Sequence, residues 1–377
     1  MSDGLDLQAL VEIIGPHFAE CATERDAGDV FVAENYDVLK RHKVFSALVP
    51  TKLGGGGAGH GAMCGFLRRL AHFCPSTALA LSMHQHLVAA AVHNHRNGRP
   101  GWALLERVAA GETVLVSTGA GDWMESSGAV EHAEGGFRVS ARKPFCSGAP
   151  RGGVLVTSAP FEDPAEGWQV LHFPVPFSAP GLSLADDWRT LGMRATGSHT
   201  VVLDGVFVPE EAVVLRRPRG RFHPAWNVIL AAALPLIMSA YAGVAEAAAG
   251  IGGEQARKRR GGDPTLPYLL GELGNHLTAA QLAVDDMVRL ARDLDFAPGL
   301  ELSCAMLARK TIAAEHVLAT VEKALEVAGG AGFYRGLGLE RLLRDAHGAQ
   351  FHPLPAKRQH RFAGRVALGL DPIADVT

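Results

Sequence analysis

The amino-acid sequence predicts an α+β protein in which long helices precede and follow a central run of short strands. Apolar residues recur every three or four positions over residues 1–112, a spacing typical of amphipathic helices. From residue 113 this spacing gives way to short β-branched runs separated by Gly, Pro and Asp, and long apolar stretches return after Pro209. We therefore predict an N-terminal helical domain over 1–112, a β domain over 113–218 and a C-terminal helical domain over 219–377.

The first domain is predicted to consist of consecutive helices interrupted by a glycine-rich break at Gly54–Gly57. The helical segments are Leu5–Ile14, Phe18–Arg25, Ala33–His42, Ala62–Phe73 and Ser76–His93. Ser76 follows Cys74 and Pro75, a position at which a helix N-cap is expected.

The middle domain is predicted to be an antiparallel sheet or a small barrel, because its strands follow one another without intervening helices. The predicted strands are 113–117, 135–140, 153–158, 168–173 and 199–204.

The last domain is predicted to contain four long helices, over Trp226–Gly250, Tyr268–Leu294, Leu300–Gly329 and Leu337–Gln350. A basic run, Arg257–Gly262, interrupts them and is expected to form a solvated loop. Val228–Ala245 is nearly long enough to cross a bilayer. We expect it to be a buried helix instead, because it holds Pro235 and Ser239 and continues into Glu246.

Composition excludes several classes of protein. The 377 residues carry a net charge of −3 and are 47% hydrophobic, which argues against a general nucleic-acid binder and against disorder. The five cysteines are dispersed without a CxxC pair, so neither a disulfide framework nor a zinc site is predicted. The N-terminus lacks a basic segment followed by an apolar core. We expect a cytoplasmic protein without a metal.

Common nucleotide and hydrolase motifs are absent from the sequence. There is no GxxxxGK[ST] loop and no GxSxG elbow. Gly330-Ala331-Gly332 continues as Phe-Tyr-Arg, where a dinucleotide-binding loop needs a third glycine.

Several stretches in a fixed order give a more specific indication. They are AlaThrGluArgAspAla (22–27), LeuValProThrLysLeuGlyGlyGlyGly (48–57), the segment 135–148 ending in LysProPheCysSerGly, TrpArgThrLeuGlyMetArgAlaThrGlySer (188–198) with LeuAspGlyValPheValPro (203–209), and GlyGlyAlaGlyPhe with LeuGluArgLeuLeuArgAspAla (329–346). In these stretches the chain resembles the acyl-CoA dehydrogenase superfamily of flavoproteins over nearly its whole length. The resemblance implies that the C-terminal domain is a four-helix bundle, that FAD or FMN lies between the domains, and that the protein is a homodimer or homotetramer.

The same resemblance implies the flavin contacts. Ser147 stands where a family hydroxyl binds the flavin edge, and Phe145 stands where an aromatic ring lies against the flavin. An alternative for Ser147 is a turn-forming role beside Gly148. For the pyrophosphate the resemblance indicates Arg257, then Arg259, and the turn that contains Gly329, Gly330 and Gly332. The family's Arg-x-x-Phe-Gly pattern is absent at these arginines.

A departure from the family pattern concerns the catalytic base. A dehydrogenase needs a carboxylate to remove the α-proton, but the two positions that match the family's glutamates are Pro353 and Ala233. The segment 344–353 instead resembles the flavin-dependent monooxygenase branch, which includes dibenzothiophene monooxygenase and the oxygenase component of 4-hydroxyphenylacetate hydroxylase. The resemblance implies catalytic roles for His352, Ser147 and His84.

Other interpretations of these histidines remain open. His84 can equally be a core histidine bonded to backbone, and His86 competes with it for the role. A metal site is not favoured, because residues two apart lie on different faces of a helix.

The sequence thus leaves three hypotheses. The first is a monooxygenase that receives reduced flavin from a separate reductase and acts on a small aromatic, heteroaromatic or amine substrate. The second is a FAD-dependent acyl-CoA dehydrogenase whose base has moved, for example to Glu246 or Asp345. The third is a non-catalytic member of the family that binds no flavin.

Overall fold

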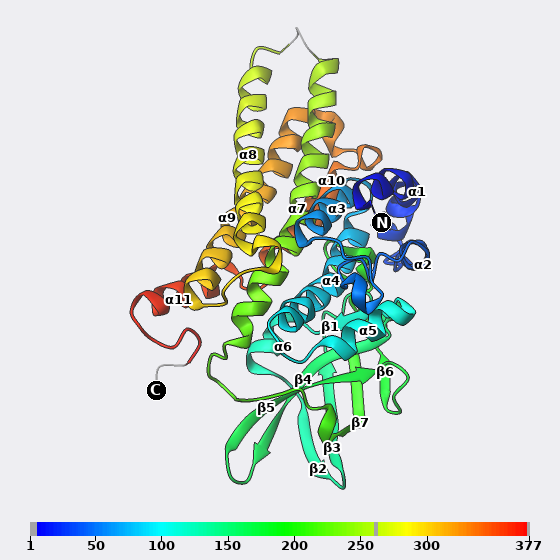
Figure 1. Cartoon of the computed structure of the whole chain (residues 1–377). Helices are drawn as coiled ribbons and strands as arrows, with labels where there is room; N and C mark the ends of the chain where they lie inside the picture. Colours follow the sequence, from blue (N-terminus) through cyan, green and yellow to red (C-terminus); the bar gives the residue numbers. More distant parts are fainter. Residues whose placement is uncertain (1–5, 260–262, 375–377) are drawn as a thin grey trace.

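A computed structural model describes residues 6–259 and 263–374 (Figure 1). In these residues the helices are α1 (Leu7–Ala27), α2 (Ala33–Arg41), α3 (His60–Phe73), α4 (Pro75–Arg96), α5 (Trp102–Gly111), α6 (Ala120–Glu125), α7 (Ala225–Lys258), α8 (Leu266–Ala291), α9 (Leu300–Ala328), α10 (Leu339–Ala346) and α11 (Ala356–Ala367). The strands are β1 (Leu115–Ser117), β2 (Ala129–Ala133), β3 (Gly136–Lys143), β4 (Val154–Asp163), β5 (Gly167–Pro176), β6 (Leu182–Leu184), β7 (Val201–Pro209) and β8 (Leu215–Pro218).

The strands form two four-stranded sheets, in the orders β1-β4-β5-β8 and β2-β3-β7-β6. Every pairing is antiparallel except that of β1 with β4, which is parallel. The prediction of a helical, then β, then helical order is confirmed, whereas the expectation of a wholly antiparallel sheet is wrong at β1. Its chain enters from the helical α5, so β1 has no hairpin partner beside it. The domain boundaries at 112/113 and 218/219 stay a prediction.

Helix α7 forms the centre of the helical part, where it packs against α3, α4, α8 and α9 (Figure 1). It is long and apolar enough to cross a membrane, but most of its apolar window is buried inside the protein. A Cβ at Gly243 would lie 2.0 Å from the carbonyl oxygen of Arg68. The absence of a side chain there allows α7 and α3 to approach closely.

Three sequence expectations about helix ends need correction. The two predicted segments at the N-terminus form one helix, α1, which continues through Pro16 because its buried face packs on the core. Ser76 is not the N-cap of α4, since Pro75 occupies the first helical turn, where its fixed φ is favourable. Arg257 belongs to the last turn of α7 and not to a loop. The remainder of the predicted basic loop, 260–262, lies outside the described residues.

Candidate functional site

A cavity of about 790 Å³ lies where α4, α6, α7 and the segment 344–362 meet the ends of the strands. One side is lined by polar groups from the β region, and the other by apolar side chains from the helices. The cavity therefore joins all three parts of the chain that the sequence distinguishes.

Hydroxyl groups from two segments converge on the β side of this cavity. The Ser147 hydroxyl lies 2.7 Å from that of Ser198, which in turn lies 2.7 Å from Thr196 Oγ1. The backbone N–H of Gly148 donates to the Thr196 carbonyl at 2.9 Å. The segment that follows β3 is thus held against the 194–198 turn, and the Ser147 hydroxyl belongs to a short polar chain at the cavity wall.

Phe145 lies at the mouth of the cavity, with 59% of its surface exposed. Its φ of +60° is unusual for a residue with a side chain, and its ring meets Trp188 edge to face at a centroid distance of 5.8 Å. These two rings form an aromatic wall beside Ser147. Cys146, between Phe145 and Ser147, is buried, and burial raises the pKa of its thiol to about 12, so it is unsuited to be a nucleophile.

A buried ion pair fixes the α6 wall relative to the segment after β3. Lys143 Nζ lies 2.6 Å from Asp122 Oδ1 and also donates to the carbonyls of Ser127 and Ser158. Asp122 accepts further bonds from Thr118 and Ser127. Although Asp122 lines the cavity, its carboxylate oxygens are already bonded to Lys143, Thr118 and Ser127.

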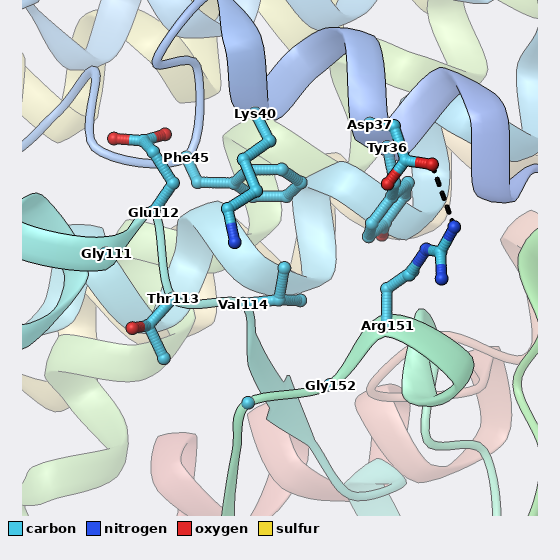
Figure 2. Close-up of a pocket in the computed structure, with 11 residues that line it drawn as sticks. Tyr36, Asp37, Lys40, Phe45, Gly111, Glu112, Thr113, Val114, Arg151 and Gly152 are labelled. Carbon is cyan, nitrogen blue, oxygen red and sulfur yellow. Dashed lines mark hydrogen bonds and ion pairs between the residues drawn. The ribbon is translucent and has the colours of Figure 1, made fainter.

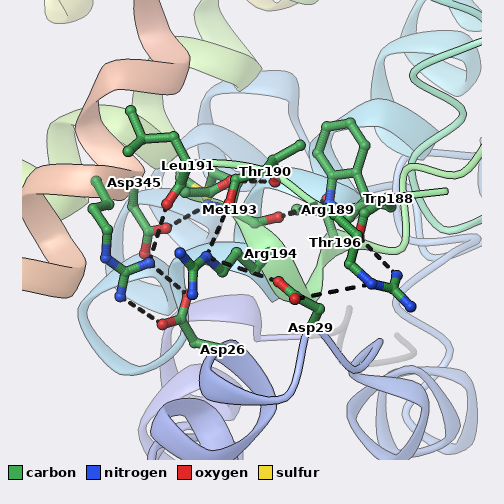
Figure 3. A network of polar contacts seen from close by, with 12 residues as sticks. Asp26, Asp29, Trp188, Arg189, Thr190, Leu191, Met193, Arg194, Thr196 and Asp345 are labelled. Atoms are coloured by element: carbon green, nitrogen blue, oxygen red, sulfur yellow. Dashed lines mark hydrogen bonds and ion pairs between the residues drawn. The ribbon is translucent and has the colours of Figure 1, made fainter.

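The 188–193 loop, which also lines the cavity, is attached to α10 (Figure 3). Asp345 accepts a hydrogen bond from the Met193 N–H, and Arg344 donates to the Leu191 carbonyl and to Asp26. A Cβ at Gly192 would lie 2.1 Å from the Arg344 carbonyl oxygen. Asp345 is fully buried and burial raises its pKa to about 6, but it does not reach the cavity. The structure therefore does not support Asp345 as the relocated base of a dehydrogenase.

Ala233 and Pro353, where the resemblance leads us to expect the family's glutamates, both line the cavity. Among the described residues, the carboxylates that line it are those of Asp122 and Glu125. Glu125 is exposed and lies 3.8 Å from Arg358. The other proposed base, Glu246, lies away from the cavity and is bonded to Arg68, His72 and Gln281. These bonds outweigh burial and lower the pKa of Glu246 to about 2.

Histidines occupy the inner end of the cavity. His352 packs edge to face against Tyr241 at a centroid distance of 5.4 Å, and His86 lines the same end. Burial lowers the pKa of His352 to about 3, with a contribution from Lys310, and burial lowers that of His86 to about 4. Both imidazoles are therefore neutral at pH 7 and can accept or donate a hydrogen bond.

His84 does not join this group. One ring nitrogen lies 2.8 Å from the Phe45 carbonyl oxygen, and the other accepts from the Leu115 N–H at 2.9 Å. Since both nitrogens are bonded to backbone outside the cavity, His84 has the structural role that the sequence left open. His86 and Tyr241 take its place at the cavity wall. Tyr241 could have been found from its spacing, because positions 233, 237 and 241 follow one face of α7.

The predicted phosphate-binding residues lie apart from this cavity. Among the described residues, Arg257, Arg259 and the turn Gly329–Gly332 do not line it. Arg257 is exposed at the end of α7. Arg259 donates to the Val327 carbonyl near the end of α9, and its guanidinium lies over Gly329. Within one copy of the chain these groups and Ser147 do not form a common site.

A second, polar cavity of about 400 Å³ lies between α2 and the segment 111–114 (Figure 2). Lys40 extends into it, and Arg151 pairs with Asp37 at 2.8 Å on its other side. The predicted site residues are absent from its described lining, so we place the functional site in the larger cavity.

The larger cavity fits the ring system of a flavin. Its β side offers hydroxyls at Ser147 and Ser198 beside the Phe145–Trp188 wall, and its other side holds neutral imidazoles. Of the arginines that line it in the described residues, Arg344 is held in ion pairs with Asp26 and Glu340, and Arg358 is an exposed side chain 3.8 Å from Glu125. The ring therefore finds partners within one copy, while a flavin phosphate inside the cavity would meet only an arginine that is already paired.

Comparisons with known proteins cover almost the whole chain. Residues 8–112 match the N-terminal domain of acyl-CoA dehydrogenases, and 228–355 match the C-terminal domain. The L-evernosamine nitrososynthase of Micromonospora sp. is 30% identical over 94% of this chain and 88% of its own length. The probable FMNH2-dependent monooxygenase SfnC of Pseudomonas putida is 26% identical, over 91% and 90%. The structure of KijD3 with FMN and dTDP-3-amino-2,3,6-trideoxy-4-keto-3-methyl-D-glucose superposes with a TM-score of 0.87 at 26% identity, over 97% and 93%.

Proposed function

Because the chain belongs to the acyl-CoA dehydrogenase family of flavin-dependent oxidoreductases, we propose that it is a monooxygenase that uses reduced FMN and O2 to oxidise the nitrogen of a small amine. The observation that carries this proposal is that histidines line the inner end of the cavity, where the resemblance leads us to expect glutamates. The positions that match the family's glutamates are Ala233 and Pro353, whereas His86 and His352 line the inner end. A neutral imidazole is suited to moving a proton near pH 7, but the α-proton of an acyl-CoA requires a positioned base.

The relatives support the choice of nitrogen as the oxidised atom. The Micromonospora relative is named as a nitrososynthase of L-evernosamine, and SfnC is named for its use of FMNH2. When bound, reduced FMN supplies the two electrons that monooxygenation of one substrate molecule requires. In this chain Ser147 and Ser198 would hold the edge of the ring, and Phe145 with Trp188 would cover it from the mouth. His352 and His86 would exchange a proton with the substrate.

Two partners follow from this proposal. A separate reductase has to deliver reduced FMN, since the sequence lacks a dinucleotide-binding fingerprint. We also propose a homodimer or homotetramer in which Arg257 and the Gly329–Gly332 turn of one copy hold the flavin phosphate of another. The exposure of Arg257 and of Gly330, together with the ion pairs that occupy Arg344 of the described cavity, supports this arrangement. A cytoplasmic location is consistent with the five free cysteines.

The experiment combines the protein with reduced FMN without oxygen and then adds ¹⁸O2 with an amine. Isobutylamine and a thymidine-diphosphate amino sugar serve as two test substrates, and products are identified by mass spectrometry. We expect one ¹⁸O atom in an N-oxidised product from at least one amine. We also expect its yield to fall about 100-fold or more in His352→Ala, a loss in the range of general acid–base catalysis, while FMN binding is retained.

Acyl-CoA dehydrogenation is the alternative that this experiment has to exclude. Release of H2O2 without any labelled product, together with reduction of bound FAD by an acyl-CoA, would overturn the proposal. Failure to bind either flavin would overturn it in favour of a non-catalytic protein.

A further inference from the structure

The inner end of the large cavity has apolar walls. Met83 of α4, Ile237 of α7 and Leu354, which are close in sequence to His86, Tyr241 and His352, line the cavity there. The polar side chains among these walls are His86, His352 and Tyr241. Such a lining favours a ligand with an apolar body and one small polar group.

The Tyr241 hydroxyl at this end lacks a protein partner. Among the described residues, Tyr241 Oη is buried without a hydrogen-bond partner, and Tyr241 is fully buried. Since an unpartnered buried polar group is costly, this hydroxyl, which can both donate and accept, indicates a bound polar group near it and near the imidazoles of His86 and His352.

The charges around the cavity restrict this group further. Arg344 is committed to Asp26 and Glu340, and Arg358 is exposed at the rim beside Glu125. Among the described lining residues, a diphosphate at the inner end therefore finds no cation without a carboxylate partner. An ammonium finds no carboxylate at the inner end, because Asp122 is bonded to Lys143 and lies on the β side.

We propose that the substrate is a phosphate-free, apolar amine that binds as its free base, with the nitrogen between His86 and His352 and the hydrocarbon body against α4 and α7. This inference rests on the proposed function and specifies its substrate. The uncharged nitrogen keeps the lone pair that it needs to attack oxygen. It can donate N–H to one imidazole and accept from another donor, which a protonated amine cannot do.

The reaction balances as R–NH2 + O2 + FMNH2 → R–NHOH + FMN + H2O. The nitrogen lone pair forms the N–O bond while the O–O bond breaks, and reduced FMN is oxidised by two electrons. The proton that nitrogen loses passes through the neutral imidazole of His352 or His86 to the departing oxygen atom, which leaves as water.

Other titratable groups surround this end, and the effect of their titration on binding must be distinguished from that of the amine itself. Lys310 of α9 acts on His352, Tyr241 of α7 packs on it, and His347 and Arg344 line the cavity near it. Asp345 of α10 acts on Tyr241. Burial keeps His352 and His86 neutral, so the imidazoles do not change charge between pH 7 and 9. Burial also lowers the pKa of Lys310 to about 8, so this lysine does lose its charge within that range.

The first test measures binding to the enzyme loaded with oxidised FMN, which does not turn over. Isobutylamine is compared with 2,2,2-trifluoroethylamine, which is of similar size but so weakly basic that it is unprotonated above pH 7. Free-base binding predicts that the affinity for total isobutylamine rises about tenfold per pH unit from 7 to 9, while that for trifluoroethylamine stays constant. The fluorinated amine thereby corrects for titration of the protein. A pH-independent affinity for isobutylamine would overturn the proposal, because the ammonium form would then bind.

The second test uses variants and the nucleotide-linked amine. Tyr241→Phe and His86→Leu should each weaken isobutylamine binding about tenfold without changing FMN affinity. His360→Gln on the exposed face of α11 is the matched control and should change neither. A thymidine-diphosphate amino sugar should neither bind in competition with isobutylamine nor be oxidised. If it is oxidised and isobutylamine is not, the substrate class is overturned while the monooxygenase function stands.

Discussion

The ammonium of Lys310 donates to the carbonyl oxygen of Leu354 at 3.1 Å, so that a buried lysine of α9 holds the segment that carries His352. A weaker contact of 3.5 Å reaches the carbonyl of Gln350. Lys310 is 1% exposed and does not line the cavity in the described structure. It acts on the site by positioning the 350–355 segment and by favouring the neutral form of His352.

Replacement of this lysine should change the pH dependence of stability. Burial lowers the pKa of Lys310 from 10.5 to about 8, so between these values the unfolded chain binds more protons than the folded protein. Stability of the wild type should therefore rise with pH from about 8 to 10.5, by up to about 3 kcal/mol. In Lys310→Met this contribution should be missing. Urea titrations of both proteins at several pH values between 8 and 10.5 check the prediction. If the free energies of unfolding of the wild type and of Lys310→Met differ by the same amount at every pH, the prediction is wrong.

The ion pair of Asp122 and Lys143 should be sensitive to removal of one partner alone. Asp122→Asn leaves the buried ammonium of Lys143 without its counter-charge, which should cost about 3–5 kcal/mol in the free energy of unfolding. Adding Lys143→Met should recover part of that loss. A loss in the double variant equal to the sum of the losses in Asp122→Asn and Lys143→Met alone, measured in denaturant titrations, would show that the pair is not coupled.

Gly192 should be required for a correctly placed cavity wall. A Cβ there would meet the Arg344 carbonyl at 2.1 Å, so Gly192→Ala should displace the 188–193 loop and weaken FMN binding about tenfold or more. Gly65 in α3 is the control, since a Cβ at that position contacts nothing within 4 Å. Gly65→Ala should leave FMN binding unchanged and raise stability by about 0.5–1 kcal/mol. Fluorescence titration with FMN distinguishes the two.

Glu246 should contribute to stability and not to catalysis. Its folded pKa of about 2 lies below the 4.5 of an ordinary glutamate, so its ion pairs stabilise the protein above pH 4.5, and this contribution disappears as the pH falls towards 2. Glu246→Gln should be less stable at pH 7 by about 1–3 kcal/mol, with the difference shrinking in acid. Oxidation of the amine per mole of bound FMN should stay unchanged. A loss of turnover of several orders of magnitude would restore Glu246 as a base.

Arg257 should affect the flavin of a neighbouring copy. In Arg257→Ala we expect FMN affinity to fall about tenfold while the oligomer mass in sedimentation equilibrium stays the same, because a charge-assisted phosphate contact is removed. Lys258→Ala, one residue further along the same exposed turn, is the control. Equal effects of the two substitutions would indicate a general loss of positive charge and no specific contact.

Much of this architecture could be predicted from sequence because it depends on local patterns. The change of spacing after residue 112 located the strands, and Ala233 and Pro353 predicted that the glutamate base of the dehydrogenases is missing from its two usual places. The roles of His84 and His86 could not be separated, since both are buried on α4 and only the tertiary structure shows which ring meets backbone. The attachment of Lys310 to Leu354 depends on packing between α9 and a distant segment, and no local pattern records it.

The contact between Asp26 and Arg344 also determines when the cavity can form during synthesis of the chain. These residues are 318 positions apart, and the same arginine holds the Leu191 carbonyl of the cavity wall. A ribosome must therefore release nearly the whole polypeptide before that wall can take its final position, and closing so long a loop carries an entropic cost. Nascent chains stalled before α10 emerges should have structured N-terminal helices without a finished cavity. Acquisition of flavin thus becomes an event that follows synthesis.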